Sequence, residues 1–144
     1  MPTTDYSDDY ATCSRTYATF RVYLDDVDPD DLTRLLGIQP TKVQRKGQFD
    51  TSKKYPKLNG WFLSTKEKCT SRDSRRHIDL LLLELEGQRK AIDAIRAQGG
   101  SCQISCFWAS ASGHGGPIIP TDQMRRLAAL DLELWFDIYM GGSE

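Results

Sequence analysis

Apolar and polar residues alternate along three segments of the chain, as expected of β-strands that bury one face. In residues 17–24, Phe20 and Val22 fall on the apolar face. The same alternation predicts strands over residues 101–109 and 132–140. In the last of these segments, the residues expected to face inward are Leu132, Leu134, Phe136, Ile138 and Met140.

Two further strands are expected in the middle of the chain. Residues 39–48 show a weaker strand pattern that leads into a polar, lysine-bearing loop over residues 48–59. Residues 60–65 then form a short apolar run with glycine at its start. The sequence therefore predicts five strands in all.

A short helix is predicted between the first two strands. Asp28 suits its N-cap and Pro29 its first position, while Gly37 suits the C-terminal cap. Five aspartates surround its start, but the spacing of a calcium-binding EF-hand loop is absent. We therefore interpret these aspartates as capping and solvated residues.

A long helix is predicted over residues 74–98, despite an interruption at Gly87. His77 in its first turn is expected to be exposed. Thr121 suits the N-cap of a third, shorter helix. The apolar stripe of the long helix consists of Ile78, Leu81, Leu82, Leu85, Ile92 and Ile95.

The predicted order of elements is β-α-β-β-α-β-α-β. Strands that alternate in polarity favour a sheet with one covered face. We therefore expect an α+β fold, with a single mostly antiparallel sheet and helices on one face, as in a ferredoxin-like two-layer sandwich. A chain of 144 residues fits one domain, which we place at residues 16–141, after a disordered acidic tail over residues 1–15.

Composition narrows the expected location and partners. Nineteen basic and 20 acidic residues give a net charge of −1, whereas nucleic-acid and membrane-surface binders normally carry a basic excess. No apolar run approaches the roughly 18 residues of a membrane span, and the first ten residues do not resemble a signal peptide. We expect a cytoplasmic protein that binds neither membranes nor nucleic acids.

The four cysteines do not predict a metal site. None of them forms a C-x-x-C pair, and no histidine has metal-ligand spacing to Cys102 and Cys106. We expect the cysteines to be reduced and mostly buried as small apolar residues. The sequence indicates no metal or other cofactor.

The second face of the predicted sheet carries aromatic and charged side chains. An exposed surface of this composition is typical of an interaction site. We expect it to bind a protein partner, to be buried in a homodimer, or to be covered by residues 39–59. RNA binding is not expected, because the aromatic motif of RNA-binding sheets is missing. The candidate partner-binding residues are Arg21, Tyr23, Phe107, Trp135, Asp137 and Tyr139.

A glycine-rich loop over residues 110–117 is the second candidate site. Its backbone N–H groups suit an anion such as a phosphate, with Arg45 and Lys46 nearby. It lacks the ending of a P-loop, and a serine and histidine two residues apart rarely align for proton transfer, so we assign no catalytic residue. The candidate ligand-binding residues are Arg45, Lys46, Ser110, Ser112, Gly113, His114, Gly115 and Gly116.

Several motifs occur in the order found in domain-of-unknown-function family 4279, and residues 16–140 resemble that family. The resemblance implies a small cytoplasmic bacterial or phage-related domain and no particular reaction. The longer acidic N-terminus and His114 depart from the family pattern. The motifs are Phe20-Arg-Val-Tyr-Leu, Asp28-Pro-Asp, Leu35-Leu-Gly37, Pro40-Thr41, Arg45-Lys-Gly47, Gly60-Trp61, Cys106-Phe-Trp108 with the glycine-rich loop, and Leu134-Trp-Phe-Asp-Ile-Tyr139.

Small size, one domain, an incomplete catalytic set and the aromatic face lead to one expected function. We expect a non-enzymatic protein that recognises another macromolecule, such as an immunity protein that neutralises a bacterial toxin. The alternative is a protein that binds a nucleotide or another phosphorylated metabolite, or a weak enzyme, through the loop over residues 110–117. A structural homodimer without a separate ligand is the third hypothesis.

Overall fold

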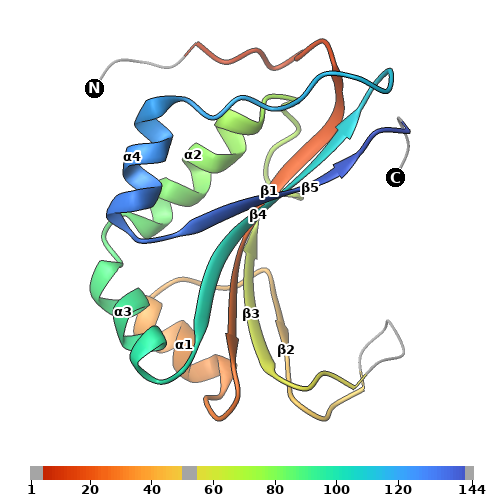
Figure 1. Cartoon of the computed structure of the whole chain (residues 1–144). Helices are drawn as coiled ribbons and strands as arrows, with labels where there is room; N and C mark the ends of the chain where they lie inside the picture. The colour runs from red at the N-terminus through yellow and green to blue at the C-terminus, as the bar shows by residue number, and fades with distance from the viewer. Residues whose placement is uncertain (1–4, 50–54, 142–144) are drawn as a thin grey trace.

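A computed structural model describes residues 5–49 and 55–141. These residues form one sheet with helices on one of its faces (Figure 1). The elements in chain order are β1 (Cys13–Leu24), α1 (Pro29–Leu36), β2 (Lys42–Gln44), β3 (Asn59–Ser64), α2 (Ser74–Leu85), α3 (Arg89–Ala97), β4 (Ser101–Ser110), α4 (Thr121–Ala129) and β5 (Glu133–Tyr139).

The strand order in the sheet is β2-β3-β1-β4-β5. Every neighbouring pair is antiparallel except β4 and β5, which are parallel and joined through α4. The order β2-β3-β1-β4 is that of a ferredoxin-like β-α-β-β-α-β unit, to which α4 and β5 are added. The expected α+β fold is confirmed, and the sheet is open rather than closed into a barrel.

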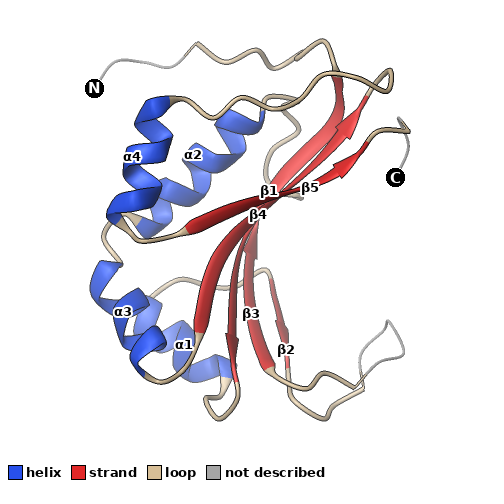
Figure 2. Cartoon of the chain, in the orientation of Figure 1, coloured by secondary structure: helices blue, strands red, loops and turns tan. Residues whose placement is uncertain are grey.

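The hydrophobic core lies between the helices and one face of the sheet (Figure 2). Phe20 and Val22 of β1 are fully buried there, together with Ile104 of β4. Trp61 of β3 reaches the first helix, where its indole Nε1 donates to Thr33 Oγ1 at 2.9 Å. The opposite face carries no helix, and we call it the open face.

The first helix has the caps that the sequence predicts. The Asp28 carboxylate accepts a hydrogen bond from the Asp30 backbone N–H at 2.8 Å, and Pro29 occupies the first turn. Gly37 adopts φ 68°, a left-handed conformation that suits glycine, and its N–H donates to the Thr33 carbonyl. This helix is therefore determined by local sequence.

The single long helix predicted over residues 74–98 is wrong, because α2 ends at Leu85 and α3 begins at Arg89. Gly87 lies in the break, where it lowers the cost of leaving the helical conformation. The break lets α2 contact β1 while α3 contacts β4 further along the twisted sheet. A single straight helix would leave one of these strands uncovered.

The described part of the N-terminal segment differs from the expected disordered tail over residues 1–15. Strand β1 already begins at Cys13, and its first residue pairs with Ser110 of β4. The Ser7 backbone N–H donates to the Asp73 carboxylate at 2.7 Å, and the Tyr10 hydroxyl donates to the Gly116 carbonyl at 2.8 Å. These bonds hold residues 5–12 against the start of α2 and the glycine-rich loop, while residues 1–4 lie outside the described residues.

Three other expectations change, two of them at the edges of the sheet. Residues 39–49 contribute the edge strand β2 and do not cover the open face, and residues 50–54 lie outside the described residues. Ile138 of β5 and Met140, which directly follows this strand, are 40% and 44% exposed rather than buried, because the end of β5 runs past α4 (Figure 1). The fourth helix is preceded by Pro120 as its N-cap residue, not by Thr121.

Two adjacent leucines of α2 test the position of the core. Leu82 is fully buried, whereas the neighbouring Leu83 is 70% exposed. Leu82→Ala should lower the free energy of unfolding by about 2–5 kcal/mol, because it leaves a cavity. Leu83→Ala should change it by less than about 0.5 kcal/mol. Urea unfolding followed by circular dichroism measures both, and equal losses would contradict the orientation of α2.

Candidate functional site

The strand register brings all six candidate partner-binding residues to the open face. Tyr17 of β1 pairs with Phe107 of β4, which pairs in turn with Asp137 of β5. Paired residues of neighbouring strands point to the same side of a sheet. The same register therefore places Arg21, Tyr23, Phe107, Trp135, Asp137 and Tyr139 together on that face, opposite the helices.

The aromatic side chains of this face contact one another across three strands. The rings of Tyr17 and Phe107 stack with their centres 4.9 Å apart and their planes 14° apart. Phe107 also contacts Tyr139, with ring centres 5.1 Å apart. Trp135 and Tyr139 remain 40% and 42% exposed. The result is a connected aromatic surface whose outer edge, at β5, faces solvent.

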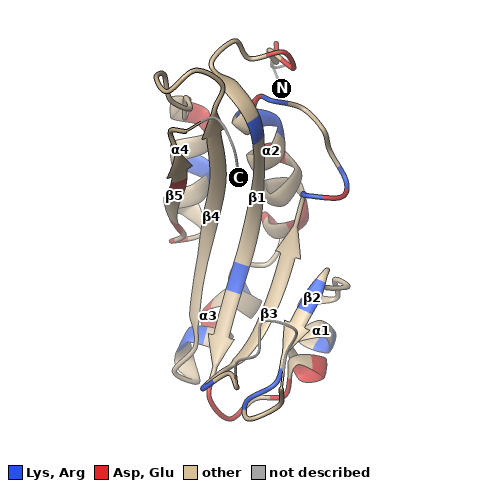
Figure 3. Cartoon of the chain, turned by 90° about the vertical axis from the view of Figure 1, so that its right-hand side faces the viewer, with Lys and Arg blue, Asp and Glu red and all other residues tan. Residues whose placement is uncertain are grey.

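Charge is divided unevenly over the open face. Lys and Arg lie on β1 and β2, whereas acidic positions lie on β5 (Figure 3). Arg21 of β1 is held in place by its Nε, which donates to Ser105 Oγ at 2.7 Å, and by the Phe62 ring, whose centre lies 5.6 Å from the guanidinium carbon. Asp137 lies on β5, with β4 between it and the basic strands.

The glycine-rich loop is held together by its own polar atoms. The fully buried Ser110 hydroxyl donates to the His114 carbonyl at 2.7 Å and accepts from the Gly113 N–H at 2.9 Å. The Ser112 hydroxyl lies 3.0 Å from His114 Nδ1. The N–H of Gly113 is therefore already engaged in the turn.

Two loop glycines have conformational reasons for their identity. Gly113 and Gly115 have φ of 85° and 92°, where other residues are strained. A Cβ atom at Gly115 would also lie 2.4 Å from Thr12 Oγ1. Gly116 accepts the hydrogen bond from Tyr10 through its carbonyl. Backbone conformation and chain packing thus explain Gly113 and Gly115, whereas a Cβ atom at Gly116 would meet nothing within 4 Å among the described residues.

Arg45 and Lys46 do not join the glycine-rich loop. Arg45 binds the carboxylates of Asp28 and Asp30 at 2.8 and 3.2 Å, and Lys46 binds Asp25, all at the end of β1. The glycine-rich loop lies at the other end, since Ser110 pairs with the first residue of β1. A strand of 12 residues is about 35–40 Å long, so the predicted ligand-binding set is divided between two ends of the molecule.

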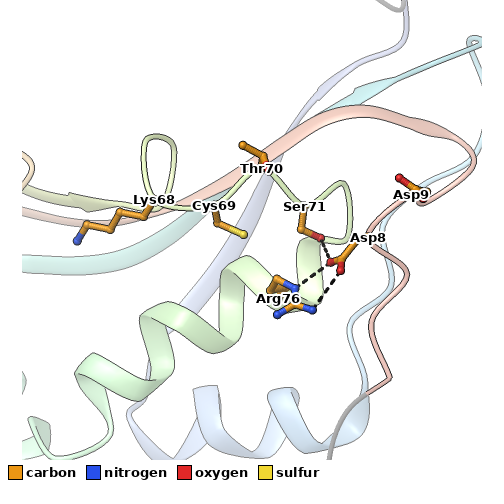
Figure 4. A pocket seen from close by; sticks show the side chains of 7 residues that line it. All are labelled: Asp8, Asp9, Lys68, Cys69, Thr70, Ser71 and Arg76. Carbon is orange, nitrogen blue, oxygen red and sulfur yellow. Dashed lines mark hydrogen bonds and ion pairs between the residues drawn. The ribbon is translucent and has the colours of Figure 1, made fainter.

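A pocket of 430 Å³ under the N-terminal segment has no signal in the sequence (Figure 4). The Asp8 carboxylate accepts hydrogen bonds from Arg76 Nε at 2.8 Å and from the Ser71 hydroxyl at 2.6 Å. The pKa of Asp8 is lower than its ordinary value. The hydrogen bond from Arg76 contributes most to this decrease, and the hydrogen bond from Ser71 contributes next. The charges of Asp8 and Arg76 neutralise each other, and the hydrogen bonds hold the N-terminal segment in place. Few polar groups of this pocket therefore remain free for a ligand.

His77 is fully buried, so the expectation that it would be exposed is wrong. Its Nε2 lies 2.7 Å from the Ser71 carbonyl and its Nδ1 lies 2.6 Å from Thr65 Oγ1. A carbonyl only accepts, so Nε2 carries the proton and Nδ1 accepts from Thr65. Burial lowers the pKa of His77 below 6.5. The neutral ring thus links the end of β3 to the start of α2.

The cysteines are free thiols, and three of the four are buried. Burial raises the pKa of Cys102 to about 11 and that of Cys106 to about 12. The reactive form of cysteine is the thiolate, and thiols with such pKa values are almost entirely protonated at neutral pH. Cys69 is half-buried beside the N-terminal segment.

Among residues 5–49 and 55–141, no group of three or more histidine, cysteine, aspartate or glutamate side chains is arranged to hold a metal ion. No helix within the described part of the chain is both long and apolar enough to cross a bilayer.

The architecture defines a class of protein: an α+β domain with an open sheet, helices on one face and an aromatic second face. Residues 14–141 match the family model described as Domain of unknown function (DUF4279), and the chain belongs to this family. The resemblance seen in its motifs is thereby confirmed. No curated protein and no solved structure matches the chain.

Two serines of the glycine-rich loop test its role as a self-bonded turn. Ser110→Ala removes the hydroxyl that bonds the Gly113 N–H and the His114 carbonyl, and should lower the free energy of unfolding by about 1–3 kcal/mol. Ser112→Ala, at an exposed position, should change it by less than about 0.5 kcal/mol. Urea unfolding of both variants measures the difference, and a silent Ser110→Ala would contradict this role.

His77 should make stability depend on pH. Its pKa is lower in the folded protein than in the unfolded chain, so the unfolded chain binds more protons as the pH falls below 6.5. The free energy of unfolding should therefore be highest above pH 6.5 and should decrease as the pH drops toward the folded-state pKa.

Urea unfolding between pH 7.5 and 5.5 measures this slope. His77→Gln should flatten it, whatever the variant's absolute stability. The control His114→Gln removes the other histidine of the chain and should leave the His77 contribution in place. A slope that survives His77→Gln would show that other groups cause it.

Proposed function

We propose that this chain is a non-enzymatic binding protein that recognises another protein through its open face. The observation that supports this most is the uncovered aromatic surface, in which Phe107 joins Tyr17 to Tyr139. A continuous exposed patch of aromatic side chains is typical of an interaction site. The helices pack against the other face of the sheet only. The stability of the fold therefore does not explain why these aromatic rings are exposed.

The geometry of the rings favours tight recognition. Tyr and Trp side chains provide large contact areas for few rotatable bonds. Here the stacking of Tyr17 on Phe107 and the bonds of Arg21 hold side chains in place before a partner arrives. Preorganisation of this kind reduces the entropy lost on binding. Tyr, Trp and Arg are also the residues most enriched at energetic centres of interfaces.

The kind of partner that we propose is a bacterial toxin, which this chain would neutralise in the cytoplasm. A protein that acts by covering another protein needs a shaped and charged surface but no catalytic group. On the open face, Arg21 of β1 and Lys42 of β2 are basic and Asp137 of β5 is acidic, and Figure 3 shows where basic and acidic residues lie along these strands. Such a divided surface selects a partner with the opposite arrangement of charge.

The alternative, a nucleotide or phosphorylated metabolite bound at residues 110–117, has less support from the geometry. The Gly113 N–H is already bonded to Ser110, and Arg45 and Lys46 lie at the other end of β1. Burial of the aromatic face in a homodimer uses the same surface as the proposed partner. The oligomeric state of the free protein distinguishes that case.

Two variants of the open face test the proposal. The chain is used as bait in its native host, and the protein that it captures is then purified and titrated calorimetrically. Phe107→Ala and Tyr139→Ala should each weaken binding by about 2 kcal/mol, or roughly 30-fold in Kd. The control Tyr55→Ala removes an exposed tyrosine from the loop before β3 and should leave the Kd unchanged.

Co-expression then tests the proposed biological effect. The wild-type chain should restore growth of cells that produce the captured protein, and Tyr139→Ala should not. Unchanged Kd values for both open-face variants would contradict the proposal. A wild-type dimer that these variants convert to monomers in light scattering, without any partner, would assign the face to self-association.

A further inference from the structure

A hollow of 260 Å³ lies on the open face, where strands β1, β2 and β3 run side by side. Arg21 enters it from β1 and Lys42 from β2, and both pair in register with Phe62 of β3, which lies between them. Hydroxyl groups add to the lining, from Thr19, Tyr23 and Ser64. No acidic side chain belongs to the lining, as far as the structure describes the chain.

The guanidinium group of Arg21 is held in position, but not all of its N–H groups form hydrogen bonds within the described part of the chain. Its Nε donates to Ser105 Oγ at 2.7 Å, and its Nη1 lies 3.5 Å from the Tyr23 hydroxyl. Phe62 supports the flat face of the group. Within residues 5–49 and 55–141, its Nη2 has no hydrogen-bond acceptor. An arginine held in this way presents the remaining N–H groups of its fork to the hollow.

Several other arginines of the chain pair with carboxylates. Arg45 pairs with Asp28, and Arg126 pairs with Asp79 at 2.9 Å. In contrast, neither Arg21 nor Lys42 pairs with a carboxylate in the described part of the chain. Two positive side chains that line one hollow repel each other, and an anion placed between them removes this repulsion.

We infer that this hollow binds carboxylate side chains of an acidic segment in the protein partner. The inference rests on the function proposed above and specifies the chemistry of the partner. Arginine forms paired, charge-assisted hydrogen bonds with a carboxylate, and Lys42 supplies a second positive charge from the adjacent strand. The hydroxyl of Ser64 can donate to the same anion. The hollow thereby decides which partner the aromatic surface accepts.

An acidic protein segment fits this face better than a nucleic acid does. Bases stack on exposed ring faces, but the Tyr17 ring is stacked on Phe107, and the cations of Arg15 and Lys66 lie over it at 5.6 and 5.3 Å. A phosphate backbone that crossed the sheet would also meet Asp137 on β5. The chain as a whole carries a net charge of −1.

Nuclear magnetic resonance tests the hollow without the partner. The probe is acetyl-Glu-Glu-Glu-amide, and acetyl-Gln-Gln-Gln-amide is its neutral counterpart. The Glu peptide should cause saturable shifts of the Arg21 Nε–H signal and of the Lys42 and Phe62 amides, which weaken with added salt. The Gln peptide should cause none.

Variants that each remove one charge measure how much the side chain contributes to binding of the Glu peptide. Arg21→Gln and Lys42→Gln should each weaken binding of the Glu peptide, the former by about tenfold because charge-assisted bonds are lost. Lys42→Gln changes an exposed side chain and guards against loss of folding in Arg21→Gln. The matched control Lys90→Gln removes the same charge from α3, on the helical side, and should leave the affinity unchanged.

Three results would overturn the inference: no shift at Arg21, equal binding of the Gln peptide, or tighter binding of octauridylate through the same residues. The last result would assign the hollow to nucleic acid. A partner that needs Phe107 and Tyr139 but tolerates both Arg21→Gln and Lys42→Gln would refute this inference alone. A hollow that binds the Glu peptide, with no partner that depends on the aromatic rings, would refute the proposed function alone.

Discussion

The pairing of β1 on both of its sides is the constraint on which the rest of the structure depends. This strand bonds to β3 along one edge and to β4 along the other, so its register sets the register of both neighbours. Successive side chains of a strand point to opposite faces, so Phe20 and Val22 cannot face the helices unless Arg21 and Tyr23 face the other way. A slip of one residue would place charge in the core and apolar side chains in water. The core and the candidate binding surface are thus determined together.

The two faces of the sheet have different roles: the helical side stabilises the fold, and the open side is the proposed binding surface. On the helical side, apolar side chains are buried and half-buried charges such as Arg126 and Asp79 pair with each other. On the open side, the aromatic rings contact one another while Arg21 retains N–H groups that no described carboxylate satisfies. Substitutions on the helical side should act mainly through folding. Those on the open side should act through binding, because the rings add little to the burial of the core.

The N-terminal segment and His77 show how long-range polar contacts complete the fold. Asp73 caps α2 by accepting from the Arg75 N–H, and also accepts from the Ser7 N–H. Bonds from Arg75 and Ser7 lower the pKa of Asp73 although its burial acts to raise it. His77, one turn further along the helix, bonds to Ser71 and Thr65 and so holds the loop that precedes α2. This network places the segment before β1 against the helices and away from the open face.

Local patterns in the sequence were sufficient for the main strands and their two faces, for the helical segments apart from the break between α2 and α3, and for the caps of α1, because these depend on side-chain period and on contacts a few residues apart. They also identified the residues of the open face, since alternation in β1, β4 and β5 follows directly from the pleat. The break of the long helix, the burial of His77 and the bonded N-terminal segment depend on partners 12 to about 70 residues away. Only the tertiary structure decided these features. It also separated Arg45 from the glycine-rich loop and brought Arg21 and Lys42 to one hollow, because strand order, which local sequence does not encode, sets which side chains meet.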